Sequence, residues 1–238
     1  TFTFIDNPSK FTKTNIMISA GRLGYGKRQF VLSLRHRPKH SKKTKFLMKK
    51  GKDRHEEYQK EIQDINDYGY IKFRRDLHKH KTIKLKELQI ISPEKAVYGI
   101  IDVLDITYTK EKNLIINLTE LKSGFNSKYY IQMMAYAMAL NDLNCKLVYG
   151  REYKRKEGEK REIGYLFPNP KNIKNISING RIYVFFNKYK QPFLEIVKDS
   201  EFAGGFAELN LGVLKRLKEY QQIMVNKIFD LSSIPHDK

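Results

Sequence analysis

The sequence contains a single cysteine, Cys145, and no apolar run that approaches the roughly 18 residues needed to span a membrane. One thiol excludes an intramolecular disulfide and any zinc or iron–sulfur site built from several cysteines of this chain. The first twenty residues lack the charged and then apolar pattern of a secretory signal. We therefore expect an intracellular protein, neither secreted nor membrane-bound, whose compartment (cytoplasm, nucleoid, organelle or virus-infected cell) stays open.

Acidic residues are scarce relative to basic ones. The 238 residues include 46 Lys and Arg against 26 Asp and Glu, which gives a formal net charge of +20. A charge of this size favours a polyanion as partner, with DNA or RNA first, and a merely solvated basic surface is the alternative. Hydrophobic residues make up 40% of the chain, which is enough for a core.

Hydrophobic periodicity predicts strands that alternate with helices along the chain. Helical spacing appears over 46–68, 128–141 and about 207–231. Strand patterns appear at 83–91, in a hairpin of 97–107 with 113–122, and in the pairs 146–154 with 161–167 and 181–186 with 193–197. Such an order predicts an α/β fold with a mixed central sheet flanked by helices.

A basic run extends from Arg35 to Arg54. It holds ten Lys or Arg residues against one acid, Asp53. Runs of this kind are often interaction segments that neutralise phosphates, although a solvated loop is the alternative. Within the run, we expect three lysines to contact a nucleic acid: Lys49, Lys50 and Lys52.

Charged residues interrupt the apolar pattern of the predicted hairpin. In its second strand, one face holds Leu114, Ile116, Leu118, Glu120 and Lys122; in its first, Asp102 stands among apolar residues. Buried charges usually pair or bind metal, because an unpaired one is costly. Two carboxylates and a lysine at the end of a hairpin predict a metal-dependent hydrolytic centre. A solvent-facing Asp102 and a simple Glu120–Lys122 ion pair are the alternatives.

Four short motifs follow one another along the chain: Gly51-x-x-x-His55, Gly99-x-x-Asp102, Glu120-x-Lys122 and Gln132-x-x-x-Tyr136. Their order and gaps resemble the RecB-like branch of the PD-(D/E)xK nucleases over roughly residues 19–140. That branch includes CRISPR-associated exonucleases, mitochondrial single-strand exonucleases and exonuclease V. The resemblance implies a restriction-endonuclease-like core in one nuclease domain over 1–238. Its parts would be a basic helical or loop segment at 1–50, a catalytic core at 51–200 and a C-terminal helix at 201–238 that packs on the core.

The resemblance also implies a role for each motif residue. Asp102, Glu120 and Lys122 would be catalytic, and His55, Asp102, Glu120 and the backbone carbonyl of Leu121 would hold Mg²⁺ or Mn²⁺. A hard divalent cation stabilises the charge that develops during phosphodiester hydrolysis, and an imidazole ligand shifts the preference toward manganese. Lys122 would orient or activate the attacking water.

Other polar residues near these motifs are weaker candidates. By the resemblance, Gln132 and Tyr136 brace the site and contact the substrate backbone, and the polar edge of a packed helix is the alternative. His55 beside two glutamates is also compatible with a surface group. Asp105 is left open between a role in supporting the site and a merely polar strand position. Glu87 could be structural or could approach the metal, and we favour the structural role.

Several family members carry an iron–sulfur cluster, held by one early and three late cysteines. The stretch from Tyr25 to Phe30 resembles the surroundings of the early cysteine but contains none. We therefore expect no cluster, and we expect the last helix to brace the N-terminal segment by ordinary packing instead. The mitochondrial and viral relatives without a cluster are the better guide.

These observations predict a metal-dependent deoxyribonuclease, an exonuclease acting on single-stranded DNA or DNA ends. A nuclease fold that binds DNA or a partner without cleavage is one alternative, and a structure-specific endonuclease is another. RNA as substrate, the polarity of cleavage and a homo-oligomeric state stay open. No membrane partner is expected, because no basic helix with an aromatic apolar face is apparent.

Overall fold

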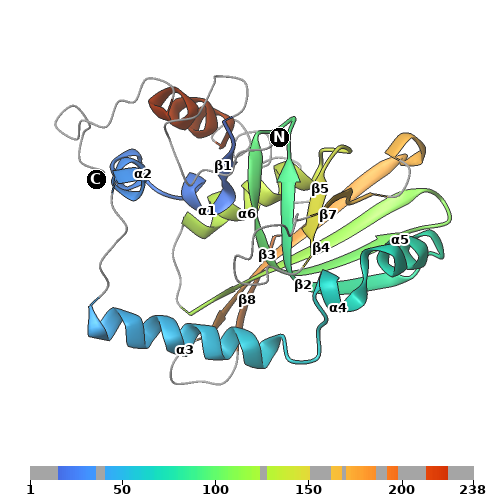
Figure 1. The fold of residues 1–238 in the computed structure, drawn as a ribbon, viewed down its shortest axis with the longest axis horizontal. Helices are drawn as coiled ribbons and strands as arrows, with labels where there is room; N and C mark the ends of the chain where they lie inside the picture. Colours follow the sequence, from blue (N-terminus) through green and yellow to red (C-terminus); the bar gives the residue numbers. More distant parts are fainter. Residues whose placement is uncertain are drawn as a thin grey trace.

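A mixed β-sheet with helices on its faces organises the computed structural model (Figure 1). The structure describes residues 16–35, 41–123, 128–150, 162–167, 170–185, 192–197 and 213–224. In chain order, the elements are β1 (Ile18–Ser19), α1 (Ala20–Leu23), α2 (Lys27–Arg35), α3 (Lys42–Tyr58), α4 (Ile65–Tyr68), α5 (Tyr70–His78), β2 (Thr82–Ser92), β3 (Val97–Tyr108), β4 (Asn113–Lys122), α6 (Lys128–Leu140), β5 (Lys146–Tyr149), β6 (Glu162–Tyr165), a 3₁₀ turn (Pro170–Asn172), β7 (Asn175–Phe185), β8 (Pro192–Val197) and a helix over 213–224.

The strands form one sheet in the order β6-β5-β2-β3-β4-β7-β8, and β1 also pairs with β3. The pairings of β2 with β3 and of β3 with β4 are antiparallel, whereas β7 runs parallel to β4 and β1 runs parallel to β3. The expected α/β fold with a mixed sheet and flanking helices is therefore confirmed.

The β3–β4 hairpin forms where the apolar pattern predicts it. Leu104 pairs with Leu118, and Ile106 pairs with Ile116, and all four side chains are buried. Ile115, between the buried Leu114 and Ile116, is 37% exposed. This alternation follows the two-residue period of a strand that covers the core with one face.

Helix α6 is the main cover of the sheet near the hairpin. All its residues from Met133 to Leu140 are buried, and three of them are alanines that allow a close approach. Gly99 on β3 lies directly under the ring of Tyr136, because a Cβ atom at that position would stand 2.6 Å from the ring carbon Cε1. The missing side chain at position 99 thus admits the tyrosine to the surface of the sheet.

The helix predicted over 46–68 is corrected by the structure. Helix α3 already begins at Lys42 and ends at Tyr58, and α4 begins only at Ile65. The carboxylate of Asp64 accepts hydrogen bonds from the backbone N–H groups of Asn66, at 2.7 Å, and Asp67, at 2.9 Å. An aspartate that caps a new helix in this way competes with continuing the old one.

The helix over 213–224 packs against the N-terminal elements (Figure 1). Tyr220 stacks on Phe30 of α2 with ring centroids 4.1 Å apart, and its hydroxyl donates to the carbonyl of Tyr25. Arg216 donates to the same carbonyl at 3.2 Å, and Gln221 donates to the carbonyl of Ile16 at 3.0 Å. Ordinary packing thus joins these two segments, which are far apart in the sequence.

Several sequence expectations concern residues outside the described ranges. One strand was expected to end at 154, and its partner was expected to begin at 161. The structure describes them as β5 and β6, and residues 151–161 between the two lie outside the described ranges. The same holds for the remainder of the helix expected over 207–231. Among the described helices, none has the length and apolar character that a membrane crossing requires.

Candidate metal centre

Three neighbouring strands bring acidic residues to the same level of the sheet. Strand β3 pairs with β2 through Val103 and Lys86, and with β4 through Val103 and Thr119. Because neighbouring strands are antiparallel, the residues after Lys86, before Val103 and after Thr119 lie at one height across the three strands. The residues at that height are all carboxylates: Glu87, Asp102 and Glu120.

Glu87 interrupts the ladder between β2 and β3. Its backbone has a φ angle of +48°, in the left-handed region that a residue with a side chain seldom adopts. Backbone pairs are formed on either side of it, by Lys86 with Val103 and by Leu88 with Ile101, but not by Glu87 itself. Strain of this kind often accompanies a functional constraint on the side chain.

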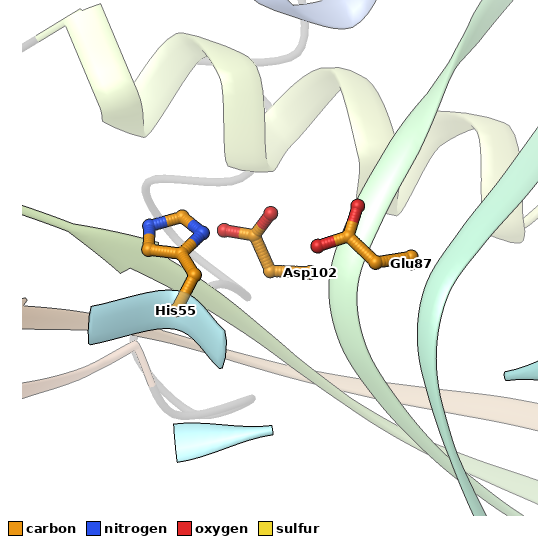
Figure 2. A group of neighbouring side chains, drawn as sticks. All are labelled: His55, Glu87 and Asp102. Atoms are coloured by element: carbon orange, nitrogen blue, oxygen red, sulfur yellow. The ribbon is translucent and has the colours of Figure 1, made fainter. Parts of the chain in front are cut away.

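His55 of α3 meets the carboxylates of Glu87 and Asp102 (Figure 2). One ligand atom from each residue lies within 4.8 Å of the other two. Two oxygen ligands of one magnesium ion, each about 2.1 Å from it, stand up to about 4.2 Å apart. The three groups could therefore close on a single ion with a shift of about half an ångström. A nitrogen and two carboxylates suit magnesium or manganese.

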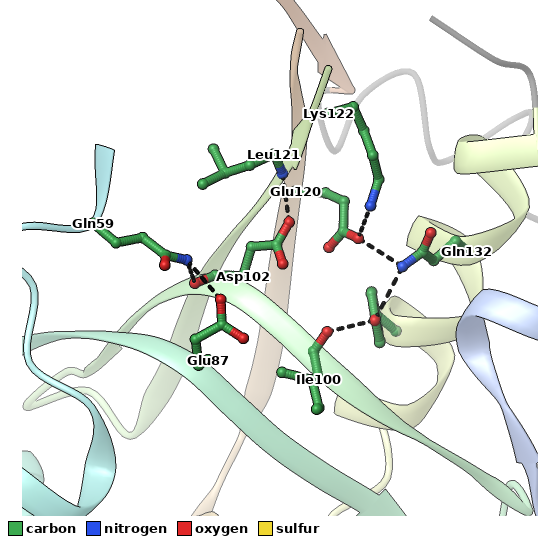
Figure 3. Close-up of polar contacts among 9 residues, drawn as sticks. Gln59, Glu87, Ile100, Asp102, Glu120, Leu121, Lys122 and Gln132 are labelled. Atoms are coloured by element: carbon green, nitrogen blue, oxygen red, sulfur yellow. Dashed lines mark hydrogen bonds and ion pairs between the residues drawn. The ribbon is translucent and has the colours of Figure 1, made fainter. Parts of the chain in front are cut away.

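Gln59, the residue after α3, joins the helix to two strands (Figure 3). Its side-chain amide donates to the backbone carbonyl of Asp102 at 2.7 Å and to the carboxylate of Glu87 at 3.2 Å. Lys86 in turn donates to the backbone carbonyl of Gln59 at 3.1 Å. Gln59 is buried, so these bonds fix the end of α3, and with it His55, relative to the carboxylates.

The carboxylate of Glu120 is buried, and its two oxygens have different surroundings. Oε1 accepts hydrogen bonds from Lys122 Nζ at 2.5 Å and from Gln132 Nε2 at 2.6 Å (Figure 3). Oε2 is buried and has no hydrogen-bond partner among the described residues. Burial raises the pKa of Glu120 to about 8, the nearby charge of Asp102 adds to the rise, and Lys122 opposes it. A cation beside Oε2 would relieve both the burial and the repulsion.

Asp102 lies between the two parts of the site. It is buried, and its Oδ2 accepts the backbone N–H of Leu121 at 2.7 Å. One oxygen of its carboxylate points toward the ring of His55 (Figure 2). The backbone of β4 thus orients this carboxylate, while the ligand role of the Leu121 carbonyl stays a prediction.

Lys122 keeps its charge next to these acids. Burial alone would lower the pKa of Lys122, but the charges of Glu120 and Asp102 outweigh this effect and raise the pKa. The ammonium group also stands over the ring of Tyr129, 5.0 Å from its centroid. At neutral pH, Lys122 therefore acts as a fixed positive hydrogen-bond donor rather than as a free amine.

A chain of hydrogen bonds from α6 supports Glu120. Gln132 Nε2 donates to Glu120 and also to the hydroxyl of Tyr136 at 3.1 Å, and this hydroxyl donates to the carbonyl of Ile100 at 2.6 Å. Burial, together with the charge of Glu120, raises the pKa of Tyr136 well above its ordinary value, so the hydroxyl stays a donor. The two residues brace Glu120 against β3, and their contact with a substrate stays a prediction.

The remaining candidates lie outside this group. Lys49, Lys50 and Lys52 are exposed on α3, and Lys52 pairs with Glu56 at 3.4 Å. Asp105 is partly buried and stands 3.9 Å from the exposed Lys84 in an ion pair. It is absent from the group that His55 forms. Its position therefore favours strand polarity over support of the site.

Sequence reasoning missed two residues of the site. The sequence favours a structural role for Glu87, whereas the geometry supports the approach to a metal, because its carboxylate belongs to the group with His55 and Asp102. Desolvation by the surrounding protein raises the pKa of Glu87, the hydrogen bond from Gln59 opposes the rise, and Asp102 adds to it. Gln59 was not singled out at all. The sequence contained one signal for Glu87, namely an acidic residue within the strand that precedes the hairpin.

A hollow of about 630 Å³ lies elsewhere, between α4, α5 and β5. Tyr70 and Tyr149 line it, stacked with ring centroids 4.4 Å apart. None of the carboxylates described above contributes to its wall. The volume of this hollow alone is therefore no reason to prefer it to the group of His55, Glu87 and Asp102 as the functional site.

Comparison with known proteins identifies no relative of this chain. No protein-family model matches the chain, and no curated protein matches it. The chemistry of the site therefore has to be inferred from the residues that the fold brings together.

Proposed function

We propose that this protein is a metal-dependent deoxyribonuclease of the PD-(D/E)xK kind, an exonuclease acting on single-stranded DNA or DNA ends. One observation carries the proposal: His55, Glu87 and Asp102 converge beside a buried Glu120, whose Oε1 accepts a hydrogen bond from Lys122 and whose Oε2 has no partner among the described residues. Structural ion pairs rarely place several carboxylates together around so little positive charge.

The donor set suits a divalent cation. His55, Glu87 and Asp102 would hold it, and the neighbouring Glu120, which lies outside that group, would supply a further oxygen through its buried Oε2. When bound, such an ion stabilises the negative charge of phosphodiester hydrolysis and makes a bound water more acidic. Oxygen-rich sites of this kind are typical of magnesium and manganese.

The chain's own residues complete the site. Lys122 presents an ammonium group to Glu120 at 2.5 Å, where it can hold an attacking water or a non-bridging phosphate oxygen. Gln132 keeps Glu120 in place from α6, and Gln59 does the same for Glu87 from α3. A preorganised arrangement of this sort lowers the reorganisation that the reaction requires.

The charge of the chain supports a nucleic acid as the substrate. The net charge is +20, and exposed lysines cover α3, the helix that carries His55. Lysines beside a hydrolytic centre would neutralise phosphates on either side of the bond that is cut, without regard to base sequence.

The test compares the wild type and three purified variants on labelled single-stranded DNA with manganese. We expect Asp102→Asn and Lys122→Ala each to lower the cleavage rate at least a hundredfold, because each removes a charge from the centre. Asp105→Asn is the matched control, since it neutralises an acid on the same strand outside the group and should cleave like the wild type. Manganese binding, measured by calorimetry, should be lost only in Asp102→Asn.

Equal cleavage by all variants would overturn the proposal. Tight DNA binding without cleavage under any divalent cation would instead favour a nuclease fold used as a binding module. Covalently closed circular DNA separates the remaining alternative, because an exonuclease leaves it intact and an endonuclease opens it.

A further inference from the structure

Helix α3 has two halves with different surroundings. From Gly51 onward it lies on the molecule: a Cβ atom at Gly51 would be 3.8 Å from Ser123 at the end of β4, and Tyr58 contacts the ring of Tyr183 with centroids 4.9 Å apart. The N-terminal half extends beyond the strands (Figure 1). There the large apolar side chains are exposed, namely Phe46 at 66%, Leu47 at 49% and Met48 at 55%.

Two of these apolar residues continue the face that carries His55. A helix advances about 100° and 1.5 Å per residue. Leu47 and Met48 therefore fall about 50° to either side of the face centred on Gly51, His55 and Tyr58. They stand about 10 to 12 Å from His55 along the helix axis. Phe46 falls about 150° from that centre, on the outer side of the helix.

Lysines border this apolar pair on both sides. By the same rotation, one flank carries Lys43 and Lys50, and the other carries Lys45 and Lys52, all about 90° to 110° from the centre of the face. Within the described part of the chain, Lys52 is the one of these four that has an acidic partner, Glu56. The N-terminal half of α3 thus presents an apolar strip between two basic edges, in line with the metal centre.

The partner of this strip has to match both features and to lie next to the candidate metal centre. An unpaired nucleic acid strand offers apolar base faces together with a phosphate backbone, and single-strand binding proteins use both. A duplex hides its base faces in the stack, so it could use the lysines but not Leu47 and Met48. The alignment of the strip with His55 places such a strand next to the bond that would be cut.

We propose that Leu47 and Met48, flanked by the lysines of α3, hold the unpaired bases next to the metal centre and make the protein select single-stranded over duplex DNA. This inference rests on the proposed nuclease function, because that function supplies the strand.

The test measures binding in the presence of a chelator, so that it does not depend on cleavage. Anisotropy is recorded for a labelled oligothymidylate and for a labelled hairpin duplex of equal length. We expect the strip variant Leu47→Gln/Met48→Gln to bind the single strand about tenfold more weakly and the duplex unchanged. Glutamine keeps the helix propensity of the replaced residues. Phe46→Gln, on the outer side of the same helix, is the matched control and should bind both DNAs like the wild type.

Three results would overturn the inference. The strip variant could bind the single strand like the wild type, it could lose both DNAs equally, or Phe46→Gln could have the same effect. Light scattering can give a fourth contradicting result, in which the wild type is a dimer and the strip variant is a monomer. The strip would then be a contact between two copies of the chain. Failure of the nuclease proposal is seen separately, as absent cleavage by a wild type that still prefers the single strand.

Discussion

At the scale of single residues, the site depends on side chains that hold other side chains. Gln59 is buried and joins the Asp102 backbone to the Glu87 carboxylate, although it lies outside the candidate metal-binding group. Glu87 needs such support, because its backbone φ of +48° is unfavourable for a glutamate. Residues that orient ligands commonly contribute as much to metal affinity as a weak ligand does.

The hydrogen bond from Gln59 to Glu87 can be removed by mutation. We expect Gln59→Leu to weaken manganese binding by about tenfold, because Glu87 loses the amide that orients it. Calorimetric titration of the metal-free protein measures this. Gln63→Leu changes an exposed glutamine a few residues further on and is the control. Unchanged manganese affinity in Gln59→Leu would show that Glu87 keeps its orientation without the hydrogen bond.

At the scale of secondary-structure elements, polar contacts determine how short helices sit beside the sheet. The hydroxyl of Tyr68, at the end of α4, donates to Asp76 in α5 at 2.9 Å, and Lys81 lies 3.5 Å from the same carboxylate. The hydrogen bond from Tyr68, reinforced by Lys81 and Arg75, holds the pKa of Asp76 below its ordinary value despite the burial of the side chain. The ionised carboxylate therefore stabilises the folded protein.

This pKa shift predicts a pH dependence with a definite sign. Because the folded protein lowers the pKa of Asp76, the stabilisation is present above the ordinary pKa of an aspartate and is lost as the pH falls through the lowered value. We expect Asp76→Asn to unfold at lower urea concentration than the wild type at pH 7, with the difference narrowing at about pH 3. Asp53→Asn, on exposed α3, is the control. A difference that stays constant with pH would contradict the role of the ionised form.

At the scale of the whole molecule, the excess of positive charge is the dominant feature. The formal net charge is +20, and α3 carries a concentrated share of it beside the candidate metal centre. The contacts of the helix over 213–224 with the N-terminal elements join both parts of the sequence into one body around the sheet. Binding to a polyanion by such a surface depends on salt, since counterions are released from the phosphates.

The dependence of DNA affinity on salt concentration can be measured for the lysines of α3. For single strands, log K falls with log salt at a slope of about −0.7 per phosphate neutralised. We expect the triple variant Lys43→Gln/Lys45→Gln/Lys50→Gln to make the slope shallower by about 2, from anisotropy titrations across salt concentrations. A control variant replaces three exposed lysines at the far end of the hairpin, Lys110, Lys171 and Lys174. An equal change in both variants would show that the charge acts diffusely rather than along α3.

The amino-acid sequence by itself determined the hairpin and most of the elements around it. Apolar alternation with a period of two is a local property, so β3, β4 and the burial of Glu120 could be predicted without knowing the fold. Net charge and the single cysteine are likewise independent of folding. The division of the helical stretch into α3 and α4 was missed, because it depends on the cap formed by Asp64.

The tertiary structure alone decided which acids meet. Glu87 joins Asp102 only because β2 pairs with β3 in one register, and Gln59 reaches both only because α3 ends beside those strands. It also decided that Leu47 and Met48, apolar in the sequence like any core residue, stay exposed. The physical reason is the same in each case: contacts between residues far apart in the chain follow from strand register and helix placement, which local patterns do not encode.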